Sequence, residues 1–199
     1  WLSMPMPSSL AFIYVYLLRD NGGWWIVDTG LSDQKTFKLW ERVISETIKP
    51  DSVKGMICTH MHPDHIGQAG VITELFRSDL FMTRTEYYQA RAFANNTGNS
   101  HSNWIGQSFY EKAGMDKDYL AQVGKMWANR KEDSMSMPGL PSGYERMEDG
   151  DTLDIGGRKW QIIVGSGHSP EHACLYCEED RILLSGDQIL PVITSNVSV

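Results

Sequence analysis

Short apolar runs separated by glycine turns open the chain, and a helical pattern follows them. Residues 12–18 are rich in aromatic and β-branched side chains, and the Asn-Gly-Gly of residues 21–23 separates them from the apolar residues 24–27. This pattern predicts a β-hairpin. Residues 33–48 then place apolar side chains at helical spacing before Pro50, which predicts a helix with one buried face.

A strand, a helix and a second strand are predicted in the next segment. The strands are the short apolar runs at residues 53–59 and 79–83, and residues 66–76 between them carry a helical pattern. Strands that alternate with a helix in this way indicate a β-α-β unit with parallel strands.

The pattern of residue types changes from about residue 84 to residue 146. Aromatic and methionine side chains are scattered there through polar sequence that is compatible with helices. We expect a helical insertion here. Its apolar residues either line a lid suited to an acyl chain or form the core of the insertion, and helical spacing favours the core. Residues 134–143 contain two prolines and two glycines and form a connector. From residue 151 to residue 190, short strand patterns and glycine turns return.

The composition limits the class of protein. A chain of 199 residues with 41% hydrophobic and 22% charged residues is ordinary for one globular domain. Its net charge of −7 comes without a basic cluster, so we expect no nucleic-acid partner. The apolar run near the N-terminus lacks the flanks of a signal peptide and is too short to span a bilayer, so we expect no membrane partner.

Three cysteines, Cys58, Cys174 and Cys177, cannot all pair within the chain and do not form a disulfide framework. We therefore expect a reducing compartment and a cytoplasmic protein. Cys174 and Cys177 have CxxC spacing, but no second CxxC completes a zinc site. Cys58 lies in an apolar strand and is expected in the core rather than as a nucleophile.

The segment ICTHMHPDHIG, residues 57–67, holds three of the six histidines of the chain. His60 and His62 are two residues apart at the end of a predicted strand, so in extended backbone their side chains project to the same side. Asp64 and His65 follow as the chain turns past Pro63. Mixed imidazole and carboxylate ligands suit Zn²⁺, Fe or Mn, so this segment predicts a metal site.

Two later residues have positions that suit the same site. His168 and Asp187 each follow an apolar strand and lie in a glycine-rich turn. Side chains at such strand ends lie at the rim of a sheet, where ligands from several strands can converge. His172 is expected as a turn or strand-start residue, with a substrate contact less favoured, and His101 is a loop residue without an evident partner.

The HxHxDH motif, followed by His168 in SGHSP and Asp187 in LSGDQ, resembles the metallo-β-lactamase-fold hydrolases over about residues 11–191, including the VDTG turn at residues 27–30. The resemblance implies an α+β fold, an αββα four-layer sandwich of two mixed sheets between helices. It also implies roles for seven residues: His60, His62 and His168 bind a first metal, Asp64 and His65 bind a second, Asp187 bridges the two, and Asp28 orients ligands.

The sequence departs from the family at its end, because the family supplies a last histidine to the second metal from beyond the bridging aspartate. No histidine follows His172 before Val199. Either the chain is a fragment or the second site lacks a ligand. We favour truncation: residues 1–199 are one metallo-β-lactamase-like domain, with C-terminal elements missing and the protein continuing past Val199.

The resemblance implies a metal-dependent hydrolase that cleaves an ester, thioester or lactone of a small molecule by a metal-bound hydroxide. We expect a thioesterase related to glyoxalase II, with one or two Zn²⁺ ions, or Fe or Mn, and with Asp64 and Asp187 as catalytic residues. The alternatives are a β-lactamase, a persulfide dioxygenase with a single iron, a ribonuclease Z-like nuclease, or a partner-binding protein without activity. The expected partner is the small-molecule substrate, and a homodimer is compatible with the sequence.

Overall fold

Two sheets form the body of the protein. The computed structural model describes residues 1–7, 11–48, 53–94, 104–128 and 139–196. The first sheet has six strands, in the order β1 (Leu2–Pro5), β2 (Phe12–Asp20), β3 (Gly23–Val27), β4 (Val53–Ile57), β5 (Leu80–Thr83) and β6 (Glu145–Met147). The second sheet has four, in the order β10 (Ile182–Leu184), β9 (His172–Cys177), β8 (Arg158–Gly165) and β7 (Thr152–Ile155).

The first sheet is mixed, as the sequence pattern predicts. Strands β1, β2 and β3 pair antiparallel, which confirms the hairpin around Gly22, whose φ of 77° lies in the region that favours glycine. Strands β3, β4, β5 and β6 pair in parallel, which confirms the β-α-β unit. The carboxyl ends of β3 and β4 therefore lie at the same edge of the sheet.

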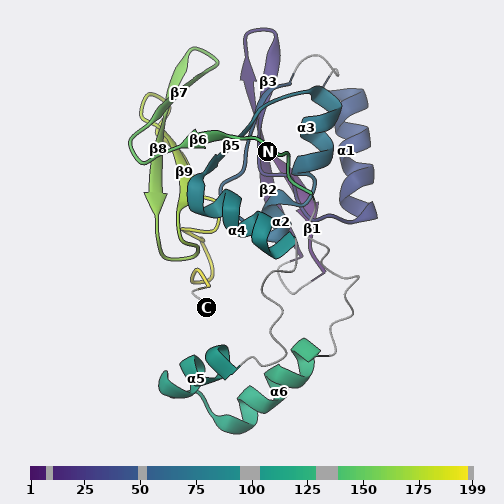
Figure 1. The fold of residues 1–199 in the computed structure, drawn as a ribbon. Helices are drawn as coiled ribbons and strands as arrows, with labels where there is room; N and C mark the ends of the chain where they lie inside the picture. Colours follow the sequence, from purple (N-terminus) through teal and green to yellow (C-terminus); the bar gives the residue numbers. More distant parts are fainter. Residues whose placement is uncertain (8–10, 49–52, 95–103, 129–138, 197–199) are drawn as a thin grey trace.

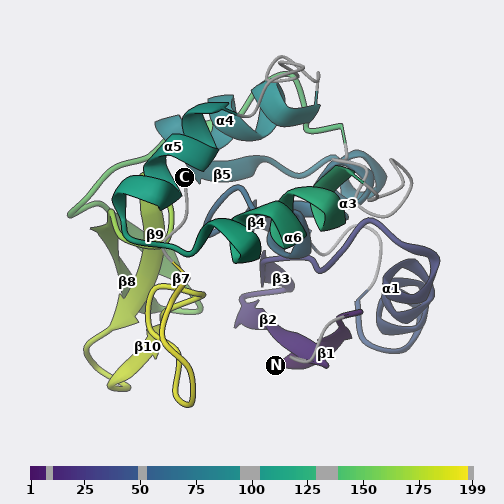
Figure 2. The same cartoon turned by 90° about the horizontal axis from the view of Figure 1, so that it is seen from below.

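The second sheet is antiparallel across its four strands, whereas the resemblance implied two mixed sheets. The short connections explain the difference. Strands β7 and β8 are separated by Gly156 and Gly157 alone, and β9 and β10 by residues 178–181. Parallel neighbours need a crossover of about a dozen residues or more. Figure 2 shows the two sheets facing each other.

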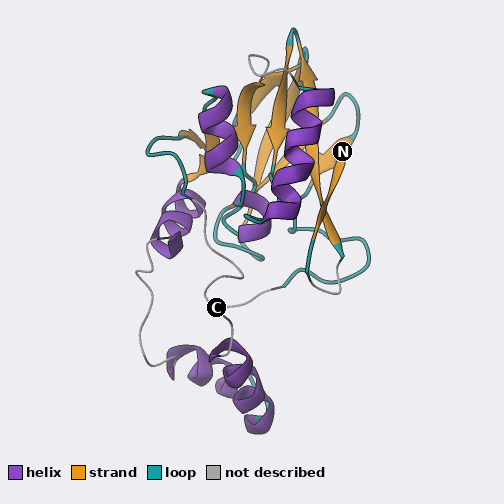
Figure 3. Cartoon of the chain, turned by 90° about the vertical axis from the view of Figure 1, so that its right-hand side faces the viewer, coloured by secondary structure: helices purple, strands orange, loops and turns teal. Residues whose placement is uncertain are grey.

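Three helices cover the first sheet on the side away from the second sheet (Figures 1 and 3). They are α1 (Gln34–Glu46), α3 (Ala69–Phe76) and α4 (Arg84–Ala94). Helix α1 begins where the Asp33 carboxylate accepts a hydrogen bond from the Thr36 backbone N–H, which caps its first turn. A single turn, α2 (Pro63–Ile66), precedes α3.

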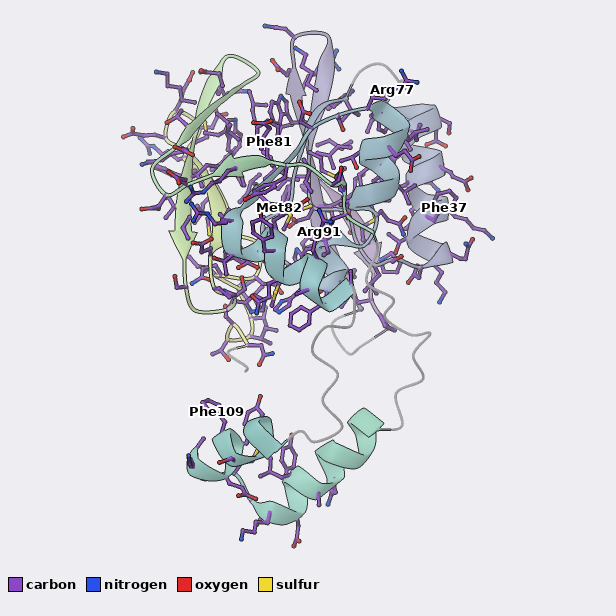
Figure 4. All side chains as sticks on the ribbon, in the orientation of Figure 1. Phe37, Arg77, Phe81, Met82, Arg91 and Phe109 are labelled. Atoms are coloured by element: carbon purple, nitrogen blue, oxygen red, sulfur yellow. The ribbon has the colours of Figure 1, made fainter. Side chains whose placement is uncertain are left out.

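Each face of the first sheet has its own hydrophobic core. Trp40, Met82 and Tyr87 belong to the core under the helices, and Ile57 and Trp160 belong to the core between the sheets. The alternation of side chains along a strand produces this division. Phe81 and Met82, both labelled in Figure 4, follow one another in β5, and Phe81 packs against the inter-sheet core.

The chain between β5 and β6 contains three helices. Helix α4 belongs to the body of the domain, because Tyr87 and Ala90 are buried in the core under the helices. Helices α5 (Trp104–Lys112) and α6 (Lys117–Ala128) contact each other and form a separate pair in Figures 1 and 3. Several aromatic side chains of these helices are about half exposed, so they do not serve as core: Tyr88, Phe93, Phe109 and Tyr119.

The fold is the predicted α+β class with two facing sheets. Among the described residues, helices α1, α3 and α4 pack against strands of the first sheet. Within the same ranges, no helix has the length and apolar character needed to cross a membrane.

Candidate metal centre

Four strand ends meet at one edge of the two sheets, and a loop with a predicted site residue follows each of them. Asp28 follows β3, the HxHxDH motif follows β4, His168 follows β8, and Asp187 follows β10. The Ala173 backbone N–H donates to the Thr59 carbonyl across a distance of 2.8 Å and joins the two sheets at this edge.

Three imidazole nitrogens form a small triangle at this edge. His60 Nε2 lies 2.9 Å from His62 Nδ1, His62 Nδ1 lies 2.8 Å from His168 Nε2, and His168 Nε2 lies 3.2 Å from His60 Nε2. Two nitrogen ligands of one tetrahedral zinc ion at about 2.0–2.1 Å are separated by about 3.3 Å. The triangle therefore has nearly the size that one divalent ion requires.

Two rings of the triangle, His60 and His62, are held in the neutral form. Burial, followed by the neighbouring His65, holds the pKa of His60 well below its usual range. Burial and the neighbouring His168 ring lower the pKa of His62 to about 4. His168 Nδ1 lies 2.9 Å from the Asn196 carbonyl and donates to it, which turns Nε2 toward the triangle. Neutral imidazole is the form that binds metal.

A second group lies beside the triangle and contains carboxylates. Asp187 Oδ1 lies 3.4 Å from His65 Nε2, and Asp187 Oδ2 lies 3.5 Å from His168 Nε2. Asp64 Oδ2 lies 3.7 Å from His65 Nε2. The ligand atoms of His60, His65 and Asp187 all lie within 4.8 Å of one another. Asp187 thus places one oxygen toward each group.

His65 shows that this second group fits a cation. Its Nε2 atom is buried and makes no hydrogen bond within the described part of the chain, although two carboxylates face it. Burial opposes a charge on His65, but Asp28 and Asp187 outweigh burial and raise the pKa of His65 well above its usual range. Positive charge is therefore favoured at this position, on the ring or on a bound cation.

Asp28 fixes the ring of His65 by contacting its Nδ1 atom. Its Oδ2 lies 2.8 Å from His65 Nδ1, and its carboxylate also accepts hydrogen bonds from the Thr59 backbone N–H and hydroxyl. Asp28 has a φ of 61°, a left-handed conformation that costs on the order of 1–3 kcal/mol for a residue other than glycine. The carboxylate leaves Nε2 of His65 as the free ligand atom, the role that the resemblance implied for Asp28.

His172 is a buried residue of the centre, which the sequence analysis placed in a turn or at a strand start. It is the first residue of β9, and its ring stacks on His60 with centroids 4.6 Å apart. Its Nε2 accepts a hydrogen bond from the Asp187 backbone N–H at 3.1 Å. A Cβ atom at Gly186 would come within 2.7 Å of this ring, so only glycine allows the approach.

The physical reason given for the HxH pair was wrong, although the two side chains do converge. Strand β4 ends at Ile57, so His60 and His62 lie in the loop beyond it. The loop, rather than the alternation of an extended strand, brings their nitrogens together. The sequence analysis also missed Glu86, a fully buried carboxylate whose contacts are described below.

The cysteines are not among the ligand atoms of the two groups, although Cys174 Sγ lies 3.8 Å from His172 Nδ1. Cys58 has no exposed surface, and burial raises the pKa of its thiol well above its usual range, as expected for a core residue. Cys174 and Cys177 are buried, unpaired and three residues apart in β9, so their side chains point to opposite faces of the sheet. His101 lies outside the described residues.

The family model of the metallo-beta-lactamase superfamily matches residues 10–199 of this chain. The chain therefore belongs to the metallo-beta-lactamase superfamily. A crystal structure of a beta-lactamase domain protein from Burkholderia ambifaria is 34% identical, with a TM-score of 0.81, over 100% of this chain and 56% of that one.

Two further proteins are similar to this chain. The metallo-beta-lactamase family protein TTHA1429 from Thermus thermophilus is 25% identical, with a TM-score of 0.75, over 100% of this chain and 62% of that one. The probable metallo-hydrolase YqjP of Bacillus subtilis strain 168 is 22% identical over 98% of this chain and 58% of its own length. The chain thus spans a little more than half the length of these relatives.

Proposed function

We propose that this protein is a metal-dependent hydrolase that cleaves an ester, thioester or lactone of a small molecule. The observation that carries the proposal is the position of Asp187, with one carboxylate oxygen toward the histidine triangle and the other toward His65. A carboxylate shared in this way offsets the repulsion of two nearby cations. Imidazole and carboxylate donors together suit Zn²⁺, with Fe or Mn as alternatives.

Divalent ions bound here would supply an activated water and polarise the carbonyl group under attack. The protein supplies the rest. His60, His62 and His168 would hold a cation at the triangle, and Asp28 keeps His65 turned toward the second group. Asp64 lies at the outer side of His65, with a side chain 17% exposed against 2% for His65, where a carboxylate can accept a proton near the solvent.

A thioesterase or esterase related to glyoxalase II is the substrate class that we favour. The support is the set of half-exposed aromatic side chains on α4, α5 and α6, including Tyr88, Phe109 and Tyr119. Exposed apolar side chains of this kind suit a ligand with an apolar part, such as the acyl group of a thioester or ester. Burial of Cys58 supports a mechanism without a cysteine nucleophile.

We propose that the protein resides in a reducing compartment, the cytoplasm, because all three cysteines are unpaired and buried. A homodimer is compatible with the proposed function and would show as a doubled mass in solution.

A panel of substrates tests the proposed function. Purified protein is assayed with a thioester, a simple ester, a lactone and a chromogenic cephalosporin, and oxygen consumption is followed with a glutathione persulfide. We expect turnover of the thioester or ester that falls by about 10²-fold in the His62→Ala variant. Turnover of the cephalosporin alone would make the protein a β-lactamase, and oxygen consumption with the persulfide would replace hydrolysis by oxygenation.

A further inference from the structure

A buried carboxylate outside the ligand set connects the two loops that carry the histidine triangle. Glu86 lies in the first turn of α4 and has no exposed surface. Its Oε2 accepts a hydrogen bond from the Met61 backbone N–H at 2.9 Å. Its Oε1 accepts one from the Ser169 hydroxyl and one from the Glu171 backbone N–H, both at 2.7 Å.

The three donors belong to residues that adjoin the ligands. Met61 lies between His60 and His62, and Ser169 follows His168 directly. His60 and His168 are 108 residues apart in sequence and come from different sheets. Glu86 therefore contacts both loops at once, and each of its oxygens is committed to one of them.

The start of α4 holds the His168 loop by two further bonds. The Glu171 carboxylate accepts a hydrogen bond from the Thr85 backbone N–H at 2.7 Å, and the Thr83 hydroxyl donates to the Glu171 carbonyl at 2.7 Å. This loop is thus fixed to the junction of β5 and α4. The HxHxDH loop reaches the same junction through the bond from Met61 to Glu86.

We propose that Glu86 is a positioning residue that sets the separation of His168 from His60 and His62, and hence the geometry of the cation held by these three rings. The inference rests on the proposed metal centre. A carboxylate is required because both oxygens accept at once and one of them accepts twice. Glutamine has a single acceptor oxygen, so its amide N–H would face either the Met61 N–H or the two donors of the His168 loop.

The test compares Glu86→Gln and Glu86→Ala with the control Tyr87→Phe. Tyr87 is the next residue of α4 and is also buried, but its hydroxyl donates to the Pro141 carbonyl and contacts neither ligand loop. Each variant is purified metal-free. Zn²⁺ affinity is measured by competition with a chelator, Co²⁺ is bound as a spectroscopic probe, and thermal unfolding is recorded without metal.

We expect Glu86→Gln to weaken Zn²⁺ binding about 10- to 100-fold, the range seen when a residue that supports ligands is replaced. We expect its Co²⁺ absorption bands to shift, while Tyr87→Phe keeps wild-type affinity and bands. Ser169→Ala removes one of the three donors and leaves the two backbone donors. We therefore expect its loss of Zn²⁺ affinity to be smaller than that of Glu86→Gln and larger than that of Tyr87→Phe. Glu86→Ala should bind metal least, and Glu86→Gln keeps the test decisive if the alanine variant does not fold.

Wild-type affinity and unchanged Co²⁺ bands in Glu86→Gln would overturn the inference. Lower thermal stability of that variant with unchanged metal binding would overturn it as well, because Glu86 would then support folding alone. If the wild-type protein itself binds neither Zn²⁺ nor Co²⁺, the proposed function fails with it. If the wild type binds metal and hydrolyses substrate while Glu86→Gln matches it, the role of Glu86 alone is wrong.

Discussion

The two ligand groups of the candidate centre differ in charge and in spacing. The first consists of His60, His62 and His168, three rings whose nitrogens lie 2.8–3.2 Å apart. The second joins His65 to carboxylate oxygens of Asp187 and Asp64 at 3.4 Å and 3.7 Å. It shares His60 with the first group, toward which Asp187 also places one oxygen. The first group already has the size of a metal site, whereas the second depends on charge and on the orientation of one ring. We therefore expect the first position to bind a cation more tightly.

The two groups meet at Asp187, so its replacement should have the largest effect. In Asp187→Ala, the histidine triangle loses the carboxylate beside it and the second group keeps only Asp64, so two cations would face each other without the charge between them. We expect kcat to fall by about 10³-fold or more, since metal centres stabilise transition states by several kcal/mol. Steady-state kinetics on the best substrate of the panel gives the value, and a folded variant with wild-type turnover would refute the role of Asp187.

A variant of the first group alone separates it from the second. His62→Ala removes one ring of the triangle and leaves His65, Asp64 and Asp187 in place. We expect the loss of the tighter-bound ion and a fall in turnover of about 10²-fold. Elemental analysis of the wild type and the variant, purified side by side, measures the metal. Equal metal content in the two proteins would remove His62 from the site.

The second group can be weakened through Asp28, which contacts the ring of His65 directly and that of His60 only through the Thr59 hydroxyl. In Asp28→Asn, the amide can still accept from the Thr59 N–H with its oxygen but presents an N–H to His65 Nδ1. The orientation of the His65 ring is then no longer fixed. We expect the affinity of the second group for its cation, the weaker of the two binding steps, to fall about 10- to 100-fold. Calorimetric titration of metal-free protein with Zn²⁺ resolves the two steps. A loss confined to the tighter step would contradict the assignment of Asp28 to the second group.

The smallest functional effect is expected outside both groups, at Cys58. Its thiol is buried in the core, so Cys58→Ser should keep kcat within about twofold while the buried hydroxyl lowers the free energy of unfolding by about 1–3 kcal/mol. Kinetics and chemical denaturation measure the two quantities separately. Abolished turnover in a folded Cys58→Ser protein would favour a cysteine nucleophile over the metal centre.

Features that depend on a short segment of sequence could be predicted, whereas features that depend on contacts between distant segments could not. The HxHxDH motif concentrates four candidate ligands in six residues, and glycine turns after apolar runs identified His168 and Asp187 as strand-end residues. The hairpin, helix α1 and the β-α-β unit came from hydrophobic periodicity, which local sequence determines. These features could be predicted because each is encoded in a short segment.

Glu86 and His172 could not be found in this way. The partners of Glu86 are 25, 83 and 85 residues away in sequence, and nothing in a helical segment distinguishes this glutamate from a solvent-exposed one. His172 could be placed at a strand start but not behind His60, because that contact depends on how the second sheet meets the first. The antiparallel order of the second sheet likewise depends on the short turns that connect its strands.

Removal and return of metal tests the central claim most directly, which is that residues of two sheets hold the cations that carry out hydrolysis. The wild-type protein is treated with a chelator until elemental analysis finds less than about a tenth of an equivalent of metal, and turnover is measured before and after adding Zn²⁺, Fe²⁺ or Mn²⁺. We predict that turnover is lost with the metal and returns with at least one of these ions, and that the same addition fails in Asp187→Ala. Full turnover in the metal-free wild-type protein would contradict the account.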